Sequence, residues 1–329
     1  MTRLYGHDSA VDAFLSGLAC GRLHHAWLIT GPQGIGKALF ADKAAARLLA
    51  EKAGPPVGEP GLDVPDEHRI AKLIAAGSHP DFIKLERLTR EGGTELARSI
   101  SVDQVRGLQR LFATTPSLSP WRAVVIDSID DLERNAANAL LKNLEEPPAN
   151  SLFLLVSHAP ERLLPTIRSR CRVLRLSPLQ GDVMAAALRS ALPDADEEEI
   201  LSLVEVGEGA PGRAIAYRGL DVASLDESMD RLAREGDPTN ASRAALAQSL
   251  SLKSAQARYE AFLARAPAVI ADQARQRTGP ALSEALSLWE RATELASSAR
   301  HLSLDPHSTV FELAGMLAAL APDEKKRAA

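Results

Sequence analysis

A glycine-rich segment near the amino terminus has the residue types and spacing of a phosphate-binding loop. Residues 31–37 fit the pattern G-x-x-x-x-G-K, with Gly31 and Gly36 as the glycines and Lys37 as the lysine. Glycines let the backbone curl so that its N–H groups face phosphate oxygens, to which the lysine adds a positive charge. We predict a nucleotide-binding loop that includes Gly34, and a purely structural turn is the alternative.

The residue that follows this lysine departs from the usual pattern. Ser or Thr is expected there because its hydroxyl binds the Mg²⁺ of a nucleotide, whereas this chain has Ala38. Phosphate binding survives the change, but one metal ligand is lost. The expected cofactor is therefore ATP with Mg²⁺, bound weakly or only by a vestigial site, and hydrolysis is expected to be inefficient.

A second candidate site lies at the end of an apolar run. Residues 124–126 are Val-Val-Ile and precede Asp127, as in a buried strand that brings a carboxylate to the Mg²⁺ of a nucleotide. Ser128 stands where an active ATPase has a glutamate, and a hydroxyl cannot act as a carboxylate base. Asp130 and Asp131 follow out of register and are interpreted as a solvated acidic loop. This stretch also predicts poor hydrolysis.

Three short apolar runs must position these residues. They cover residues 26–30, 123–126 and 152–156, and none of them alternates with polar residues. Continuous apolar runs of this length are typical of strands buried on both faces of a parallel sheet. Helical patterns separate them, one directly after the phosphate-binding loop and others over 101–112 and 134–146. Strands that alternate with helices predict a three-layer α/β domain.

The second half of the chain has a different pattern. After residue 176 the apolar residues recur at helical spacing, with breaks at Pro193, 207–212 and 236–238. This predicts helices without further strands. The predicted domains are an α/β nucleotide-binding domain over 1–177, a small helical domain over 178–235 and an all-α domain over 236–329.

The segment after the first predicted helix has no metal-binding pattern. Residues 54–67 are rich in Pro, Gly and acidic residues, which predicts a surface excursion or mobile insertion. His68 and His79 lie close by, but two histidines without a neighbouring cysteine are too few for a zinc site. We interpret them as surface or locally hydrogen-bonded residues and expect no zinc and no other structural metal.

The composition excludes several classes of function. The chain has 329 residues, 45% hydrophobic and 25% charged, as expected of a soluble protein of two or three domains. Its net charge of −5 means that any DNA binding needs a local basic patch rather than the overall charge. The aromatic content of 4% argues against a base-stacking platform. An apolar run of about 18 residues would predict a membrane span, and the sequence has no such run. With only Cys20 and Cys171 as cysteines, we expect a cytoplasmic protein.

Two further stretches carry a resemblance to a known family. Residues 135–148 read Asn-Ala-Ala-Asn-Ala-Leu-Leu-Lys-Asn-Leu-Glu-Glu-Pro-Pro, and residues 168–172 read Arg-Ser-Arg-Cys-Arg. By their chemistry alone they are a small-residue helix with an abrupt stop and a basic surface run. Together with Tyr-Gly-His at 5–7 and His-His-Ala at 24–26, they resemble the bacterial clamp-loader AAA+ family over nearly the whole first half of the chain.

The resemblance implies a fold and roles for individual residues. It implies a RecA-like AAA+ domain, a helical lid and a C-terminal collar that joins subunits in a ring-like assembly. Arg170 would be an arginine finger that acts in trans on the ATP of a neighbouring subunit. Ser157 or His158 would occupy the sensor-1 region. Arg213 would contact the γ-phosphate as a sensor-2 residue, with a surface arginine at a helix start as the alternative.

The resemblance also implies partners and two competing activities. The partners are gamma/tau and delta clamp-loader subunits in a hetero-pentamer, the sliding clamp and, through the assembly, primed DNA during replication. The chain would either complete the ATPase site of a neighbour, as a stator, or act as an active gamma/tau-type ATPase motor. Ala38 and Ser128 favour the first activity. No polymerase activity is expected, and no acceptor-site pattern supports an unrelated nucleotide kinase.

Overall fold

The computed structural model describes residues 3–89, 96–302 and 304–322. The chain forms two compact units, Met1–Ala216 and Tyr217–Ala329. The strands all lie in the first unit, and the described residues beyond 176 form helices and their connections, as predicted. The finer division of the chain into three domains, at 177 and 235, stays a prediction.

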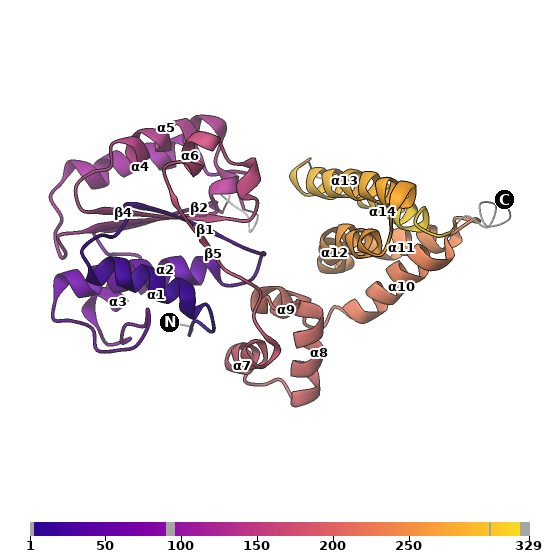
Figure 1. The fold of residues 1–329 in the computed structure, drawn as a ribbon, viewed down its shortest axis with the longest axis horizontal. Coiled ribbons are helices and arrows are strands. Elements are labelled where there is room, and N and C mark those ends of the chain that lie inside the picture. Colours follow the sequence, from indigo (N-terminus) through magenta and orange to yellow (C-terminus); the bar gives the residue numbers. More distant parts are fainter. Residues whose placement is uncertain (1–2, 90–95, 303, 323–329) are drawn as a thin grey trace. The chain divides into compact units, whose positions relative to one another are not determined.

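The first unit is built on a five-stranded sheet in which all strands are parallel, in the order β2-β3-β4-β1-β5 (Figure 1). The predicted parallel α/β sheet is therefore confirmed. The three apolar runs form its central strands β1, β3 and β4, which are buried along almost their whole length. The strands are β1 (Ala26–Thr30), β2 (Phe82–Glu86), β3 (Arg122–Asp127), β4 (Ser151–Ser157) and β5 (Arg172–Arg175).

The two edge strands were not predicted. In β2 only Leu85 is buried, and in β5 only Leu174 is buried. An edge strand is partly open to solvent, so it does not need the continuous apolar run that marks a central strand. The arginines of β5 made this stretch look like a basic surface run, although it pairs with β1.

Helices cover both faces of the sheet. Figure 1 shows α1 (Asp8–Ala19), α2 (Lys37–Ala53) and α3 (Arg69–Ala75) on one face. The other face carries α4 (Val102–Ala113), α5 (Arg134–Glu145) and the short α6 (Pro165–Arg168). The three predicted helices are confirmed as α2, α4 and α5, and a capping box formed by Ser101 and Gln104 begins α4.

The described residues that follow β5 are helical in both units. The helices α7 (Gly181–Ala191), α8 (Glu197–Gly207) and α9 (Pro211–Tyr217) share a small core around Met184 and Leu188. The second unit contains α10 (Val222–Glu235), α11 (Ala241–Leu250), α12 (Gln256–Arg275), α13 (Gly279–Leu302) and α14 (Pro306–Ala318). Short 3₁₀ segments are η1 (Ile129–Asp131), η2 (Pro160–Arg162) and η3 (Lys253–Ala255). Among the described helices, none combines the length and apolar character needed to cross a membrane.

The loop that follows α2 is fastened to the domain by two buried cations. Arg47 donates from Nη1 to the carbonyl oxygens of Glu59 and Asp63, at 2.7 and 2.9 Å, and from Nη2 to that of Val57 at 3.1 Å. Lys43 lies 2.6 Å from the Asp63 carboxylate. Both cationic side chains come from α2 and are buried. One guanidinium therefore satisfies three main-chain acceptors in a segment without regular secondary structure.

The segment 54–67 lies largely at the surface, as expected of an excursion, but it is also anchored to the domain. Leu62 and Val64 are buried and belong to the core beneath α2. The Pro- and Gly-rich composition of the segment hides this anchoring, because its partners lie on the preceding helix.

Replacing Arg47 with Met should destabilise the first unit by about 3 kcal/mol, because three partly buried carbonyl groups lose their donor and the Glu51 carboxylate loses its cation. Arg106→Met is a matched control, since Arg106 is exposed and should change the free energy of unfolding by less than about 0.5 kcal/mol. Urea denaturation followed by tryptophan fluorescence measures both. Equal effects of the two substitutions would show that the loop does not depend on Arg47.

Candidate functional site

The predicted phosphate-binding loop joins the end of β1 to the start of α2. Its three glycines have positive φ angles, 143° at Gly31, 81° at Gly34 and 104° at Gly36. L-residues with a side chain rarely adopt such angles, so the glycines allow the curled backbone that was predicted. The loop therefore has the local conformation that can direct main-chain N–H groups towards an anion at the start of α2.

Lys37 is folded onto the same loop. Its Nζ donates to the carbonyl oxygens of Gly31 and Pro32, both at 2.7 Å, and only 3% of the residue is exposed. Burial lowers the pKa of Lys37 to about 8, against the attraction of the Asp130 and Asp127 carboxylates, which acts to raise it. Phosphate oxygens would compete with these carbonyl groups for the ammonium.

Asp130, which was expected in a solvated acidic loop, instead belongs to the candidate site. It is half-buried, and its carboxylate accepts from Ser128 Oγ at 2.9 Å, Ser157 Oγ at 2.8 Å and the His158 N–H at 2.5 Å. It thereby joins the turn after β3 to the end of β4, where the sensor-1 region was expected. Two of its partners lie 27 and 28 residues away, so no local pattern could reveal them. Asp131 is a surface residue that pairs with Arg87 at 3.2 Å.

Asp127 ends β3, as predicted, and has a cation beside it. Lys84 Nζ, from the neighbouring strand β2, lies 3.8 Å from Asp127 Oδ2, 3.0 Å from Asp42 Oδ2 and 3.7 Å from Glu86 Oε2. Burial disfavours the ammonium, but the attraction of these three carboxylates outweighs it and raises the pKa of Lys84 above its usual value. Lys84 therefore carries a full positive charge within the site.

The residues around Asp127 do not fit a magnesium ion. Mg²⁺ requires octahedral oxygen ligands and is commonly held by a hydroxyl and one or two carboxylates together with the phosphates. Ala38 offers a methyl group, the Ser128 hydroxyl donates to Asp130, and Asp127 faces Lys84. We therefore derive no chemical step through Mg²⁺ at this site.

The histidines near the 54–67 loop have local roles, as predicted. His68 caps α3 by accepting from the Ile70 N–H, and His79 Nδ1 accepts from the Asp81 N–H at 3.0 Å. Across residues 3–89, 96–302 and 304–322, no three His, Cys, Asp or Glu side chains are grouped as ligands for a metal ion.

The start of α9 is docked against the phosphate-binding loop. The Gly212 N–H donates to the Gly34 carbonyl at 2.7 Å, and a Cβ atom on Gly34 would lie only 2.5 Å from the Arg213 nitrogen. Arg213 is thus brought to the loop by its main chain, as the sensor-2 prediction requires. Its guanidinium pairs with Glu208 Oε2 at 2.7 Å, and its γ-phosphate role stays a prediction.

Arg170 lies away from this loop, at the other end of the sheet. It precedes the amino end of β5, whereas the loop follows the carboxyl end of β1, the parallel neighbour of β5. The four residues of β5 separate the two positions by about 13 Å along the strand direction. The structure therefore does not bring Arg170 together with the loop of its own chain.

The guanidinium of Arg170 is on the surface and is held by its own chain. Nη2 lies 2.9 Å from Glu145 Oε1, at the end of α5, and Nη1 donates to the Thr166 carbonyl at 2.8 Å. About a third of the side chain is exposed, 34%. The next residue, Cys171, packs on the core under α4 and α5, and burial raises the pKa of its thiol to about 12. Cys171 therefore anchors the motif as a neutral, apolar residue.

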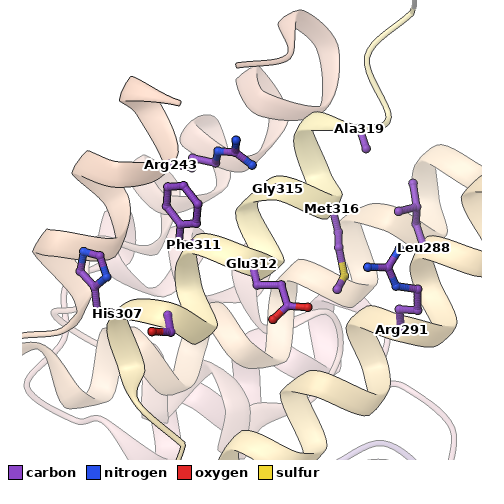
Figure 2. Close-up of a pocket in the computed structure, with 10 residues that line it drawn as sticks. Arg243, Leu288, Arg291, His307, Phe311, Glu312, Gly315, Met316 and Ala319 are labelled. Carbon is purple, nitrogen blue, oxygen red and sulfur yellow. The ribbon is translucent and has the colours of Figure 1, made fainter. Parts of the chain in front are cut away.

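The second unit contains a groove of about 620 Å³ between α11, α13 and α14. Figure 2 shows Arg243 near Phe311 and Arg291 near Met316, with Glu312 between the two arginines. The Arg243 guanidinium lies 4.5 Å from the Phe311 ring centroid. The groove offers apolar and charged contacts together. Its lining residues are Arg243, Leu288, Arg291, His307, Ser308, Phe311, Glu312, Gly315, Met316 and Ala319.

A parallel sheet with a glycine-rich loop and lysine after β1 and a carboxylate at the end of β3 defines a P-loop α/β protein. The chain belongs to the family described as DNA polymerase III, delta subunit, whose model matches residues 6–180.

Curated relatives agree with this family. The chain is 37% identical to DNA polymerase III subunit delta′ of Pseudomonas aeruginosa, over 71% of this chain and 69% of that protein. It is 32% identical to subunit delta′ of Escherichia coli, over 62% of this chain and 58% of that protein. It is also 30% identical to subunit gamma of Buchnera aphidicola, over 63% of this chain and 54% of that protein. The similarity thus extends to more than one kind of DNA polymerase III subunit.

The Lys37 ammonium should titrate with a midpoint near pH 8 in NMR of ¹³C-labelled lysine. Asp130→Asn should lower the midpoint further, because it removes a favourable negative charge. The folded pKa lies below the unfolded value of about 10.4, so the Lys37 contribution to stability should rise between about pH 8 and 10.4. The difference in the free energy of unfolding between the wild type and Lys37→Met, followed across this pH range, measures the Lys37 contribution. A midpoint at the ordinary lysine value would contradict this burial.

Gly34→Ala should destabilise the first unit more than Gly21→Ala. Both positions have positive φ, so alanine costs about 1–2 kcal/mol at each. A Cβ atom at position 21 would meet open space. A Cβ atom at position 34 would clash with the main-chain nitrogen of Arg213, and this clash should add about 2 kcal/mol to the loss of stability. Urea denaturation compares the two variants. Similar losses at both positions would mean that α9 does not dock tightly on the loop.

Proposed function

We propose that this chain is a delta′-type subunit of a bacterial clamp loader that completes the ATP site of a neighbouring subunit with Arg170. The curated relatives are DNA polymerase III delta′, gamma and tau subunits, which supports a place in such an assembly. The observation that carries the proposal is the position of Arg170, partly exposed at the sheet edge opposite its own phosphate-binding loop.

The chemistry of Arg170 suits action across a subunit boundary. A guanidinium can donate two parallel hydrogen bonds to phosphate oxygens and offset the charge that develops during phosphoryl transfer. Its present partners are the Glu145 carboxylate and a main-chain carbonyl, both at the surface. An exposed ion pair contributes little free energy, so a phosphate can replace Glu145 at small cost.

The P-loop of this chain is proposed to bind nucleotide without efficient hydrolysis. The curled loop and Lys37 support phosphate binding. Ala38 lacks a metal-binding hydroxyl, and Ser128, whose hydroxyl is bound to Asp130, replaces the catalytic glutamate. These residues favour the stator role over a gamma/tau-type motor.

We also propose the RecA-like AAA+ organisation, with roles for the helical parts of the chain. The helices that follow β5 would act as the lid, and their contact with the loop through Gly212 supports this role. The C-terminal helices would form the collar that packs with the gamma/tau and delta subunits. The assembly would open the sliding clamp and load it on primed DNA in the cytoplasm.

Arg170→Ala should lower ATP hydrolysis at the adjacent site by about 10³-fold in a loader reconstituted with gamma/tau, delta, clamp and primed DNA. Arg168→Ala, an exposed arginine two residues earlier, is the matched control and should leave the rate unchanged. Thermal unfolding should be nearly unaffected by both changes, because the Arg170 ion pair is exposed.

Two outcomes would contradict the proposal. An unchanged rate with Arg170→Ala would exclude the finger role. ATP turnover of about 1 s⁻¹ or more by the isolated chain would instead favour the motor.

A further inference from the structure

Lys84 occupies a special position in the candidate site. Its ammonium lies 3.8 Å from Asp127 Oδ2, and it comes from an edge strand rather than from the phosphate-binding loop. About a quarter of the Lys84 and Asp127 side chains is exposed, 27% and 24%. The pair is thus neither a loose surface contact nor sealed in the core.

We propose that the Lys84 ammonium takes the place of Mg²⁺ as the counter-charge of Asp127, so that the P-loop binds a nucleoside di- or triphosphate free of divalent cation. This inference rests on the proposed nucleotide binding by the same loop. It assigns Lys84 to the nucleotide site, in which the sequence pattern had placed no residue of β2.

The first argument is electrostatic. Asp127 ends β3 and Asp130 is hydrogen-bonded to Ser157 at the end of β4, so both carboxylates lie at the carboxyl edge of the sheet, from which the phosphate-binding loop leaves β1. A phosphate chain that approaches an uncompensated carboxylate meets repulsion, which Mg²⁺ ordinarily offsets. Lys84 already supplies one positive charge next to Asp127, so this carboxylate does not need a metal ion for the same purpose.

The second argument is that Lys84 is held in place. Its Nζ lies 3.0 Å from Asp42 Oδ2, on the second turn of α2, and the other oxygen of that carboxylate is buried without a hydrogen-bond partner. If Lys84 moved away, the Asp42 charge would remain partly buried and uncompensated, which is unfavourable. An incoming Mg²⁺ would have to displace an ammonium that is fixed by a second carboxylate.

The third argument concerns the remaining ligand positions. A metal ion beside Asp127 would find the methyl group of Ala38 and the hydroxyl of Ser128, which donates to Asp130. Mg²⁺ gives up its water ligands reluctantly and needs several well-placed oxygens. Ala38 and Ser128 weaken a metal site, but they do not alter the glycines and Lys37 that would bind phosphate.

A purely structural role for Lys84 makes a different prediction. As an ion pair that only ties β2 to α2, Lys84 would affect stability and leave the response of nucleotide binding to Mg²⁺ unchanged. Binding measured with and without the metal therefore separates the two roles.

Calorimetric titration of the full-length chain with ADP and with ATP, in excess Mg²⁺ or in EDTA, tests the proposal. The wild-type Kd should differ by less than about twofold between the two conditions. Lys84→Gln should weaken binding about tenfold in EDTA, and Mg²⁺ should restore only part of it, because the metal then gains the Asp127 carboxylate but still lacks the other oxygen ligands that it needs. Lys84→Arg keeps the positive charge and should behave like the wild type.

A second measurement follows the metal directly. Mn²⁺ that binds beside the phosphates broadens the ³¹P resonances of bound ADP, so broadening should be weak in the wild type and measurably greater in Lys84→Gln. Circular dichroism and thermal unfolding show that each variant is folded. If Lys84→Gln does not fold, the wild type and Lys84→Arg still provide the metal dependence and the Mn²⁺ signal.

Three results would overturn the inference. They are a wild-type affinity that falls about tenfold or more in EDTA, a folded Lys84→Gln variant that responds to Mg²⁺ like the wild type, and an absence of nucleotide binding in both conditions. The last result removes nucleotide binding by this chain but leaves the trans role of Arg170 intact, because the reconstituted ATPase assay tests that role independently.

Discussion

The buried ammonium of Lys37 is the constraint on which the candidate site depends. A charge removed from water needs polar partners, and this one obtains two carbonyl oxygens from the curled loop and opposing charge from Asp127 and Asp130. The carboxyl edge of the parallel sheet is where such partners can gather. Polar residues end the three central strands there: Thr30 on β1, Asp127 on β3 and Ser157 on β4.

The arrangement separates two tasks within one chain. The phosphate-binding loop lies at the carboxyl edge of the sheet and Arg170 at the amino edge, so a single α/β domain can receive a nucleotide on one side and present a guanidinium on the other. In the proposed ring of related domains, this polarity would let each member act on the next. Loss of metal ligands on the receiving side need not affect the presenting side, because no residue is shared between them.

Much of the fold could be predicted from the sequence, because central strands need continuous apolar runs and helices need periodic ones. The strands β1, β3 and β4 and the helices α2, α4 and α5 follow from these patterns. The edge strands β2 and β5 did not, since partial exposure relaxes the pattern.

The candidate site was predictable only where its residues follow one another in the chain. The loop glycines, Lys37 and Asp127 met this condition. Asp130 and Lys84 did not, because each acquires its role from partners on other elements: Ser157 lies 27 residues from Asp130, and Asp42 lies 42 residues from Lys84. Contacts of this kind depend on the tertiary fold and leave no local signature.

The fastening of the 54–67 loop by Arg47 has a consequence for the conditions under which this domain keeps its shape. A guanidinium stays protonated throughout the pH range of folded proteins, and the main-chain carbonyl oxygens that it binds do not titrate. The loop is thus secured by groups that neither chelators nor thiol oxidants attack. Its integrity should not vary with the zinc supply or the redox state of the cell.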